Sequence, residues 1–203
     1  MGEMRRCVKE WIRLSGKEAE HVSLSQDTAH EDLRQRRELR ANSSVFVDQA
    51  AVRAAIYGRI LVLEGVDRVE RNILPLLNNL LENREITLED GRLLLPPHRA
   101  HSLMKTNSAH QGNVVHVHPD FRVIGLMKTN GRKASTLDPP LRSRFQARYF
   151  PSLSVGSLLQ LSREEAPQLS SSSPIVMKNY VKVVDALASA EGGSYRTCLS
   201  LGY

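Results

Sequence analysis

The run Ile60–Leu63 constrains the fold of this chain more than any other feature. Its four residues are all apolar, and it lies between the charged residues Arg59 and Glu64. A short continuous apolar run of this kind is typical of a strand that is buried on both faces of a parallel sheet. In open α/β sheets, ligands bind at the carboxyl ends of such strands. The sequence therefore predicts an α/β fold with a candidate site at Glu64.

The segments around this run have the patterns of strands, a helix and a hairpin. Residues 21–24 and 121–127 are β-prone, and each predicts a further strand. Residues 48–57 place apolar side chains at helical spacing and are followed by Gly58, a common stop signal for helices. Residues 85–95 carry an Asp-Gly pair between two β-prone arms, which is the strongest short-range hairpin signal in the chain.

Two charged stretches predict further helices. Residues 1–20 carry two large apolar side chains among charges and have the pattern of a short helix. Asp27 and Thr28 can cap a helix at its N-terminus. We therefore expect a charged helix that continues through Leu33 and Leu39.

The net positive charge comes from one segment. The 203 residues carry 28 Lys and Arg against 22 Asp and Glu, a formal net charge of +6. Residues 121–148 contain seven basic residues and one acidic residue, which accounts for the whole surplus. Such a charge favours a phosphate-bearing or acidic partner. Aromatic residues are only 5% of the chain, so stacking platforms are scarce and nucleic acid is a poor candidate.

Composition excludes several other classes. The two cysteines, Cys7 and Cys198, cannot form a disulfide scaffold or a four-cysteine zinc site. No apolar run approaches the roughly 18 residues that a membrane span needs. His116 and His118 could share a face of a strand and bind metal, but no fixed ligand spacing supports this, and a solvated, irregular insert is the favoured interpretation.

Several spaced motifs together resemble one protein family. Residues 59–92 read RILVLEGVDRVERNILPLLNNLLENREITLEDGR and resemble the dynein-related, midasin-like branch of the AAA+ ATPases, in which a Walker B strand precedes a helix and a hairpin with an acidic-Asp-Gly turn. Residues 137–145, LDPPLRSRF, resemble the arginine-finger motif of that branch. Residues 21–33 resemble the strand and Asp-Leu segment that follow the phosphate-loop helix. The resemblance covers about residues 20–148.

The resemblance implies a partial P-loop NTPase (AAA+) parallel sheet with flanking helices and a β-hairpin insert. It implies ATP binding and hydrolysis with Mg²⁺, in a ring of homo- or hetero-oligomeric AAA+ subunits, with mitochondrial localisation. Glu64 would hold the metal ion and Asp67 would assist catalysis. Lys128 and Asn130, at the end of the sensor strand, would contact the nucleotide.

The same resemblance assigns a role to two arginines. Arg142 and Arg144 would be offered to the γ-phosphate of a neighbouring subunit, where a guanidinium offsets the charge that develops in the transition state. The alternative for each is an ion pair at a helix end or an interface.

The sequence departs from the family pattern in two places. A phosphate loop needs G-x-x-x-x-G-K-[ST], but the Gly16-Lys17 pair is followed by a glutamate, and Trp11 stands where the first glycine belongs. Gly65 stands where the family has a glutamate that polarises the attacking water. We therefore expect a truncated module with impaired catalysis alone. The alternative is a non-catalytic interaction fragment that supplies an arginine finger to a complete AAA+ partner.

These motifs divide the chain into three parts. Residues 1–20 are predicted to be an N-terminal helical remnant, and residues 21–150 a partial AAA+ core. Residues 151–203 are rich in serine and proline, which predicts a mostly flexible tail with a helix over residues 175–188.

Overall fold

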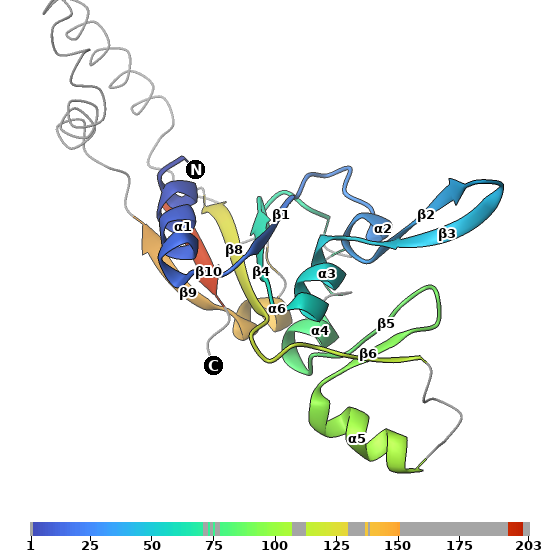
Figure 1. The fold of residues 1–203 in the computed structure, drawn as a ribbon. Coiled ribbons are helices and arrows are strands. Elements are labelled where there is room, and N and C mark those ends of the chain that lie inside the picture. The colour runs from blue at the N-terminus through green and yellow to red at the C-terminus, as the bar shows by residue number, and fades with distance from the viewer. Residues whose placement is uncertain are drawn as a thin grey trace, which may run out of the picture.

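The centre of the fold is a sheet whose first three strands are parallel. The computed structural model describes residues 2–70, 73, 75, 78–106, 113–129, 137, 139–150 and 195–200. Within this part of the chain, the largest sheet has five strands in the order β1-β4-β8-β10-β9 (Figure 1). Strands β1, β4 and β8 run parallel, and β10 is antiparallel to both β8 and β9. The strands span Ala19–Ser23 (β1), Ile60–Glu64 (β4), Arg122–Thr129 (β8), Gln146–Phe150 (β9) and Tyr195–Ser200 (β10).

Strand β4 is buried on both faces, as its apolar run predicts. Each of its four apolar residues is no more than 1% exposed. Ile60 and Val62 join the cluster formed with helix α1 (Gly2–Ser15), whereas the residues between and after them join the core that includes helix α3 (Ala50–Tyr57). Because a helix covers each face, no side chain of the strand before Glu64 meets water. The strand therefore does not need polar residues at alternate positions. The predicted α/β sheet is confirmed.

The predicted helix through Leu33 and Leu39 is wrong, because a short helix and a hairpin take its place. Helix α2 ends after four residues, and strands β2 and β3 follow as an antiparallel pair. Ala41 and Asn42 between them have φ angles of 47° and 64°, as the two central residues of a tight hairpin turn do. Leu39 is 85% exposed, so it does not extend an apolar helix face. The elements span His30–Leu33 (α2), Gln35–Arg40 (β2) and Ser43–Asp48 (β3).

The hairpin predicted from the Asp-Gly pair is confirmed. Strands β5 and β6 pair antiparallel, and Gly91 adopts a φ of +84° in the turn between them. The Leu88 amide donates to the Arg92 carbonyl at 2.8 Å, which closes the turn. Strand β7 then pairs in parallel with β6. The remaining elements span Asn78–Glu82 (α4), Ile86–Thr87 (β5), Leu93–Leu95 (β6), Pro97–Thr106 (α5), Val114–His116 (β7) and Pro139–Arg144 (α6).

A buried polar network joins the two hairpins. The Gln35 side chain is 1% exposed and donates to Asp48 Oδ1 at 2.7 Å and to Asp90 Oδ2 at 2.8 Å. Arg92 donates from Nε to Asp90 Oδ2 at 2.6 Å and also pairs with Asp48. Burial raises the pKa of the Asp90 carboxyl, but the hydrogen bonds from Gln35 and Arg92 outweigh it and hold that pKa below its ordinary value. The base of one hairpin is thus fixed to the turn of the other.

The C-terminal part of the chain contributes one described element. Strand β10 lies between β8 and β9 and comes from the segment for which the sequence predicts a mostly flexible tail. The helix predicted over residues 175–188 lies outside the described residues. Of the helices that the structure describes, none is both long and apolar enough to cross a bilayer.

Glu20 ties strand β1 to the elements beside it. Arg53 of α3 donates to both of its carboxylate oxygens, at 3.1 and 2.8 Å, and Arg59 donates to Oε1 at 2.7 Å. The hydrogen bonds from Arg53 are the main cause that lowers the pKa of Glu20, and Arg59 adds to it against the opposing effect of burial. The Glu20 side chain is 14% exposed, so this pairing is partly shielded from solvent.

We expect Glu20→Gln to lower the free energy of unfolding at pH 7 by roughly 1–2 kcal/mol, since Arg53 is partly exposed and solvent screens the pair. Folding lowers the pKa of this carboxyl, so its contribution is fully present above the ordinary value of about 4.3 and is lost as the pH falls through the lowered value. Urea unfolding of both chains at a series of pH values should show the difference shrinking below about pH 4. Glu10→Gln, in an exposed pair with Arg13, is the control, and a difference that is independent of pH would contradict this account.

Candidate functional site

The carboxyl ends of β1, β4 and β8 form one edge of the sheet. Ser23 pairs with Glu64, and Glu64 pairs with Leu126, so the three residues lie side by side. The Leu24 amide donates to the Glu64 carbonyl at 2.7 Å, and the Gly65 amide donates to the Leu126 carbonyl at 2.8 Å. These bonds hold the first residues beyond the strands in place, and Glu64 is the acidic side chain that ends the central strand.

The Glu64 carboxylate is in contact with a cation from the same chain. Arg5 Nη2 lies 2.5 Å from Glu64 Oε2, and the Glu64 side chain is only 16% exposed. Helix α1 ends at Ser15, shortly before β1 begins at Ala19, so the end of the helix lies at the amino end of this strand. The first turn of the helix therefore lies at the carboxyl end of the sheet (Figure 1). Sequence reasoning missed this contact, because nothing in the pattern of the first twenty residues indicates which carboxylate Arg5 would meet.

Asp67 and Lys128 meet at the same edge. The backbone amide of Lys128 donates to Asp67 Oδ1 at 3.1 Å, so Asp67 holds the last residues of β8 next to the loop after β4. The sequence predicts both residues at this site, and the structure brings them together. Their predicted roles in catalysis and nucleotide contact stay predictions. Asn130 lies outside the described residues.

With these contacts in place, the described residues do not fit a divalent metal ion. Mg²⁺ binds oxygen ligands in a strict geometry, but Glu64 is paired with Arg5, and Asp67 accepts a backbone hydrogen bond. Across the residues whose positions the structure gives, no three His, Cys, Asp or Glu side chains gather as a metal site. His118 Nδ1 accepts the Asp120 amide at 3.0 Å, which does not leave that nitrogen open to a metal.

Gly65 has a backbone that disfavours a side chain. Its φ is +80°, and a Cβ added there would lie 2.9 Å from the Leu24 carbonyl oxygen. The glutamate that the family places at this position would therefore be strained in this conformation. The local structure thus favours a glycine at this position, where the sequence departs from the pattern of the family that it resembles.

Arg142 and Arg144 lie at the opposite end of the sheet. Both are on α6, which ends just before β9 begins at Gln146. Ser200 of β10 pairs with both Gln146 of β9 and Ile124 of β8, so Gln146 lies at the height of Ile124 in the sheet. Glu64 pairs with Leu126, which is nearer the carboxyl end of β8. The residues before Gln146 therefore lie toward the amino end of β8. Figure 1 shows α6 at the end of the sheet away from the tips of β4 and β8. The structure therefore separates the predicted site residues into two groups.

The two arginines differ in their surroundings. Arg144 is 22% exposed on its side chain and donates from Nε to Glu82 Oε2 of α4 at 3.0 Å. Arg142 is exposed, and within the described residues it has no ion pair. Leu141, just before Arg142, is 1% exposed and anchors the helix in the core. The ion-pair alternative for Arg144 is observed in this chain, whereas Arg142 is accessible to a partner.

The described residues of the basic segment do not form a single patch. Arg122 Nη1, at the amino end of β8, donates to the Pro119 carbonyl at 2.7 Å, and Lys128 lies at the carboxyl end of the same strand. Arg148 is exposed on β9. Arg132 and Lys133 lie outside the described residues. Those basic residues of the segment that the structure describes thus lie along the length of the sheet and are not gathered at one surface.

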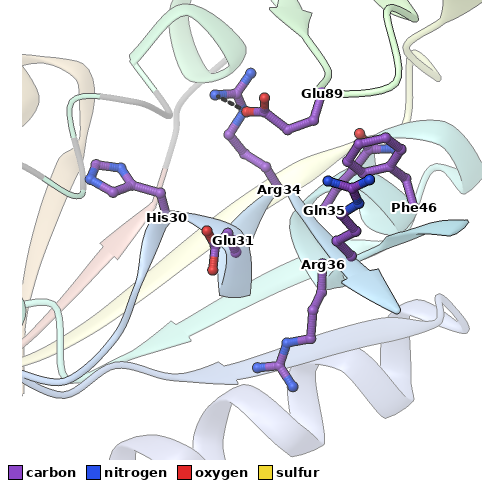
Figure 2. Close-up of a pocket in the computed structure, with 8 residues that line it drawn as sticks. His30, Glu31, Arg34, Gln35, Arg36, Phe46 and Glu89 are labelled. Atoms are coloured by element: carbon purple, nitrogen blue, oxygen red, sulfur yellow. Dashed lines mark ion pairs between the residues drawn. The ribbon is translucent and has the colours of Figure 1, made fainter. Parts of the chain in front are cut away.

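The structure also contains a groove that the sequence did not predict. It lies beside α2 and the β2–β3 hairpin, has a volume of about 460 Å³, and includes Glu89 from the second hairpin (Figure 2). Arg34 pairs with Glu89 at 3.2 Å, and the Arg37 guanidinium lies 5.9 Å from the centre of the Phe46 ring. The lining residues are His30, Glu31, Arg34, Gln35, Arg36, Arg37, Phe46 and Glu89. The sequence does not indicate the groove, because the charged pattern of this stretch predicts a helix and the short Ala-Asn turn is a weak hairpin signal.

Comparison with known proteins agrees with these motifs. A family model described as "AAA domain (dynein-related subfamily)" matches residues 5–145. The chain is also 49% identical over 152 residues to von Willebrand factor A domain-containing protein 8 of Mus musculus. That alignment covers 72% of this chain and 8% of the mouse protein, so the chain spans a small part of this relative.

The conformation of Gly65 predicts a specific cost for a side chain. Gly65→Ala should reduce the free energy of unfolding by roughly 2–4 kcal/mol, through positive φ and the contact with the Leu24 carbonyl. Gly91→Ala is the matched control, because its φ is +84° and nothing lies within 4 Å of an added Cβ; it should cost about 1–2 kcal/mol. Urea unfolding measures both. Equal losses for the two variants would show that the carbonyl contact is unimportant.

Proposed function

Since this chain belongs to the AAA domain family, in its dynein-related subfamily, we propose that it is a module that binds and hydrolyses ATP in a ring of AAA+ subunits. The family implies nucleotide binding with a metal and assembly into oligomeric rings. ATP as the nucleotide and mitochondrial localisation are finer proposals that rest on the resemblance in the motifs. Mg²⁺ as the metal is a further one, and Glu64 would hold it only after Arg5 has left that carboxylate.

One observation carries this proposal. Glu64 ends the central buried strand of a parallel sheet, between the carboxyl ends of β1 and β8. This is the edge at which open α/β sheets bind ligands. Asp67 and Lys128 lie at the same edge, joined by a hydrogen bond. The arrangement supports a nucleotide site here.

We propose further that these 203 residues alone have impaired catalysis. They contain no G-x-x-x-x-G-K-[ST] segment whose amides could cradle phosphate. Gly65 offers no carboxylate to polarise water, and Arg5 is paired with Glu64. The phosphate cradle would have to come from outside these residues, and Asp67 is the carboxylate predicted to assist hydrolysis.

The purified 203-residue chain is accordingly expected to show no ATP turnover above the uncatalysed background. Phosphate release and calorimetric titration with Mg-ATP measure this. A dynein-related AAA module that carries the phosphate-loop motif, assayed in parallel, is the positive control. Micromolar affinity together with turnover by the 203 residues would overturn the proposal of impaired catalysis.

A second candidate function is an interaction module that supplies an arginine finger to a complete AAA+ partner. The separation of Arg142 and Arg144 from Glu64 supports it, because groups at the amino end of a sheet cannot act on a nucleotide bound at its carboxyl end. In a ring, that end can face the nucleotide of a neighbouring subunit. A guanidinium there would offset transition-state charge.

Variants of the Arg144–Glu82 pair test this role. In an assembly of this chain with a phosphate-loop-containing partner, Arg144→Ala should lower the ATPase rate on the order of 10³-fold, as loss of an arginine finger does. Glu82→Gln breaks the same ion pair but leaves the guanidinium, so it should keep the rate. Arg148→Ala, exposed on β9, controls for general loss of charge.

The outcomes separate a finger from a structural ion pair. If Arg144 only holds α6 against α4, Glu82→Gln will reproduce the effect of Arg144→Ala, and thermal unfolding will shift equally in both variants. An unchanged rate in Arg144→Ala would assign no finger role to this residue. Arg142→Ala, tested in the same assembly, then shows whether the exposed arginine carries the role.

A further inference from the structure

The Glu64 carboxylate is held by a cation that helix packing places there. Met4, next to Arg5, is 0% exposed, and Val8 one turn further along is 6% exposed. Both belong to the cluster that includes Ile60 and Val62 of β4. The first turn of α1 is therefore fixed on the sheet, and the Arg5 side chain leaves the helix from an anchored position.

The geometry of this contact leaves little space for a second cation. Arg5 Nη2 and Glu64 Oε2 are 2.5 Å apart, and Glu64 is 16% exposed, so the remaining access to its oxygens is small. The two opposite charges are thus in direct contact, and the partial burial of Glu64 reduces the screening of this ion pair by solvent. A divalent ion on the same carboxylate would also be repelled by the guanidinium.

We propose that Arg5 is the resident cation of Glu64 and that it excludes a divalent metal ion from this carboxylate for as long as the pair is formed. This inference rests on the proposed function only for the identity of Glu64 as the family's metal position. Arg5 then prevents free metal ions from binding to the Glu64 carboxylate. A metal ion can bind there only after the Arg5 guanidinium has moved away from the carboxylate.

The pair differs from the contact that Arg13 makes on the same helix. Arg13 pairs with Glu10 at 2.8 Å, but both side chains are more than half exposed, and neither belongs to a strand. Solvent screens such a pair, and its loss changes little. Arg13 therefore provides a matched control in which one arginine of α1 is removed without any change at the sheet.

Titration with Mn²⁺ in the absence of nucleotide tests the proposal. The concentration of free Mn²⁺ is followed by its electron paramagnetic resonance signal. The 203-residue chain and Arg13→Gln should bind Mn²⁺ only weakly. Arg5→Gln should bind at least about tenfold more tightly, a difference of 1.4 kcal/mol. The double variant Arg5→Gln with Glu64→Gln should lose that gain.

Each outcome decides the question. Equal Mn²⁺ affinity in the unsubstituted chain and Arg5→Gln overturns the proposal, as does a gain that survives in the double variant. Circular dichroism checks that the variants fold. Arg5→Met keeps the length of the side chain and a high helix propensity, and it takes the place of Arg5→Gln if that variant unfolds. Because no nucleotide is present, failure here leaves the proposed ATPase function untouched.

Discussion

The burial of β4 on both faces is the constraint on which the rest of this structure depends. A strand of four apolar residues needs a cover on each side, and α1 and α3 supply those covers. The first position of the strand that can carry a charged side chain is its last residue, Glu64. Because α1 must lie flat on the sheet to cover Ile60 and Val62, its first turn arrives at that same end, and Arg5 meets Glu64 there. The packing of the core thus also determines the charge at the candidate site.

Those parts of the fold that depend on local periodicity could be predicted. The apolar run of β4, the helix that stops at Gly58 and the Asp-Gly hairpin each carry their signal within a few residues, and all three are confirmed. The β2–β3 hairpin could not be predicted in this way. Its first strand is rich in Arg and Glu, as a solvated helix is, and its turn contains no glycine. What holds it is the buried Gln35 side chain, whose partners include Asp90 far along the chain.

The candidate site shows the same division. The family resemblance predicts Asp67 after the central strand and Lys128 at the end of the sensor strand, and the structure joins them by a hydrogen bond. Two other features depend on elements remote in sequence. The contact between Arg5 and Glu64 follows from the packing of α1. The position of Arg144 at the far end follows from the strand order through β10, which comes from a segment that the sequence predicts to be mostly flexible.

The separation of charges along the sheet changes what the basic segment means. Its seven basic residues are close in sequence, but those that the structure describes are not close in space. Lys128 lies near the carboxyl end of β8, whereas Arg144 lies on α6, at the amino end of the sheet. A polyanion bound at one end would meet only part of this charge. At each end, moreover, an arginine already pairs with a glutamate of the same chain, Arg5 with Glu64 and Arg144 with Glu82. In the proposed ring, a phosphate that approaches Arg144 would share the N–H donors of its guanidinium with Glu82. At the other end, Arg5 occupies the Glu64 carboxylate. Each end of the sheet thus carries an internal ion pair that a ligand of the proposed site must displace or share.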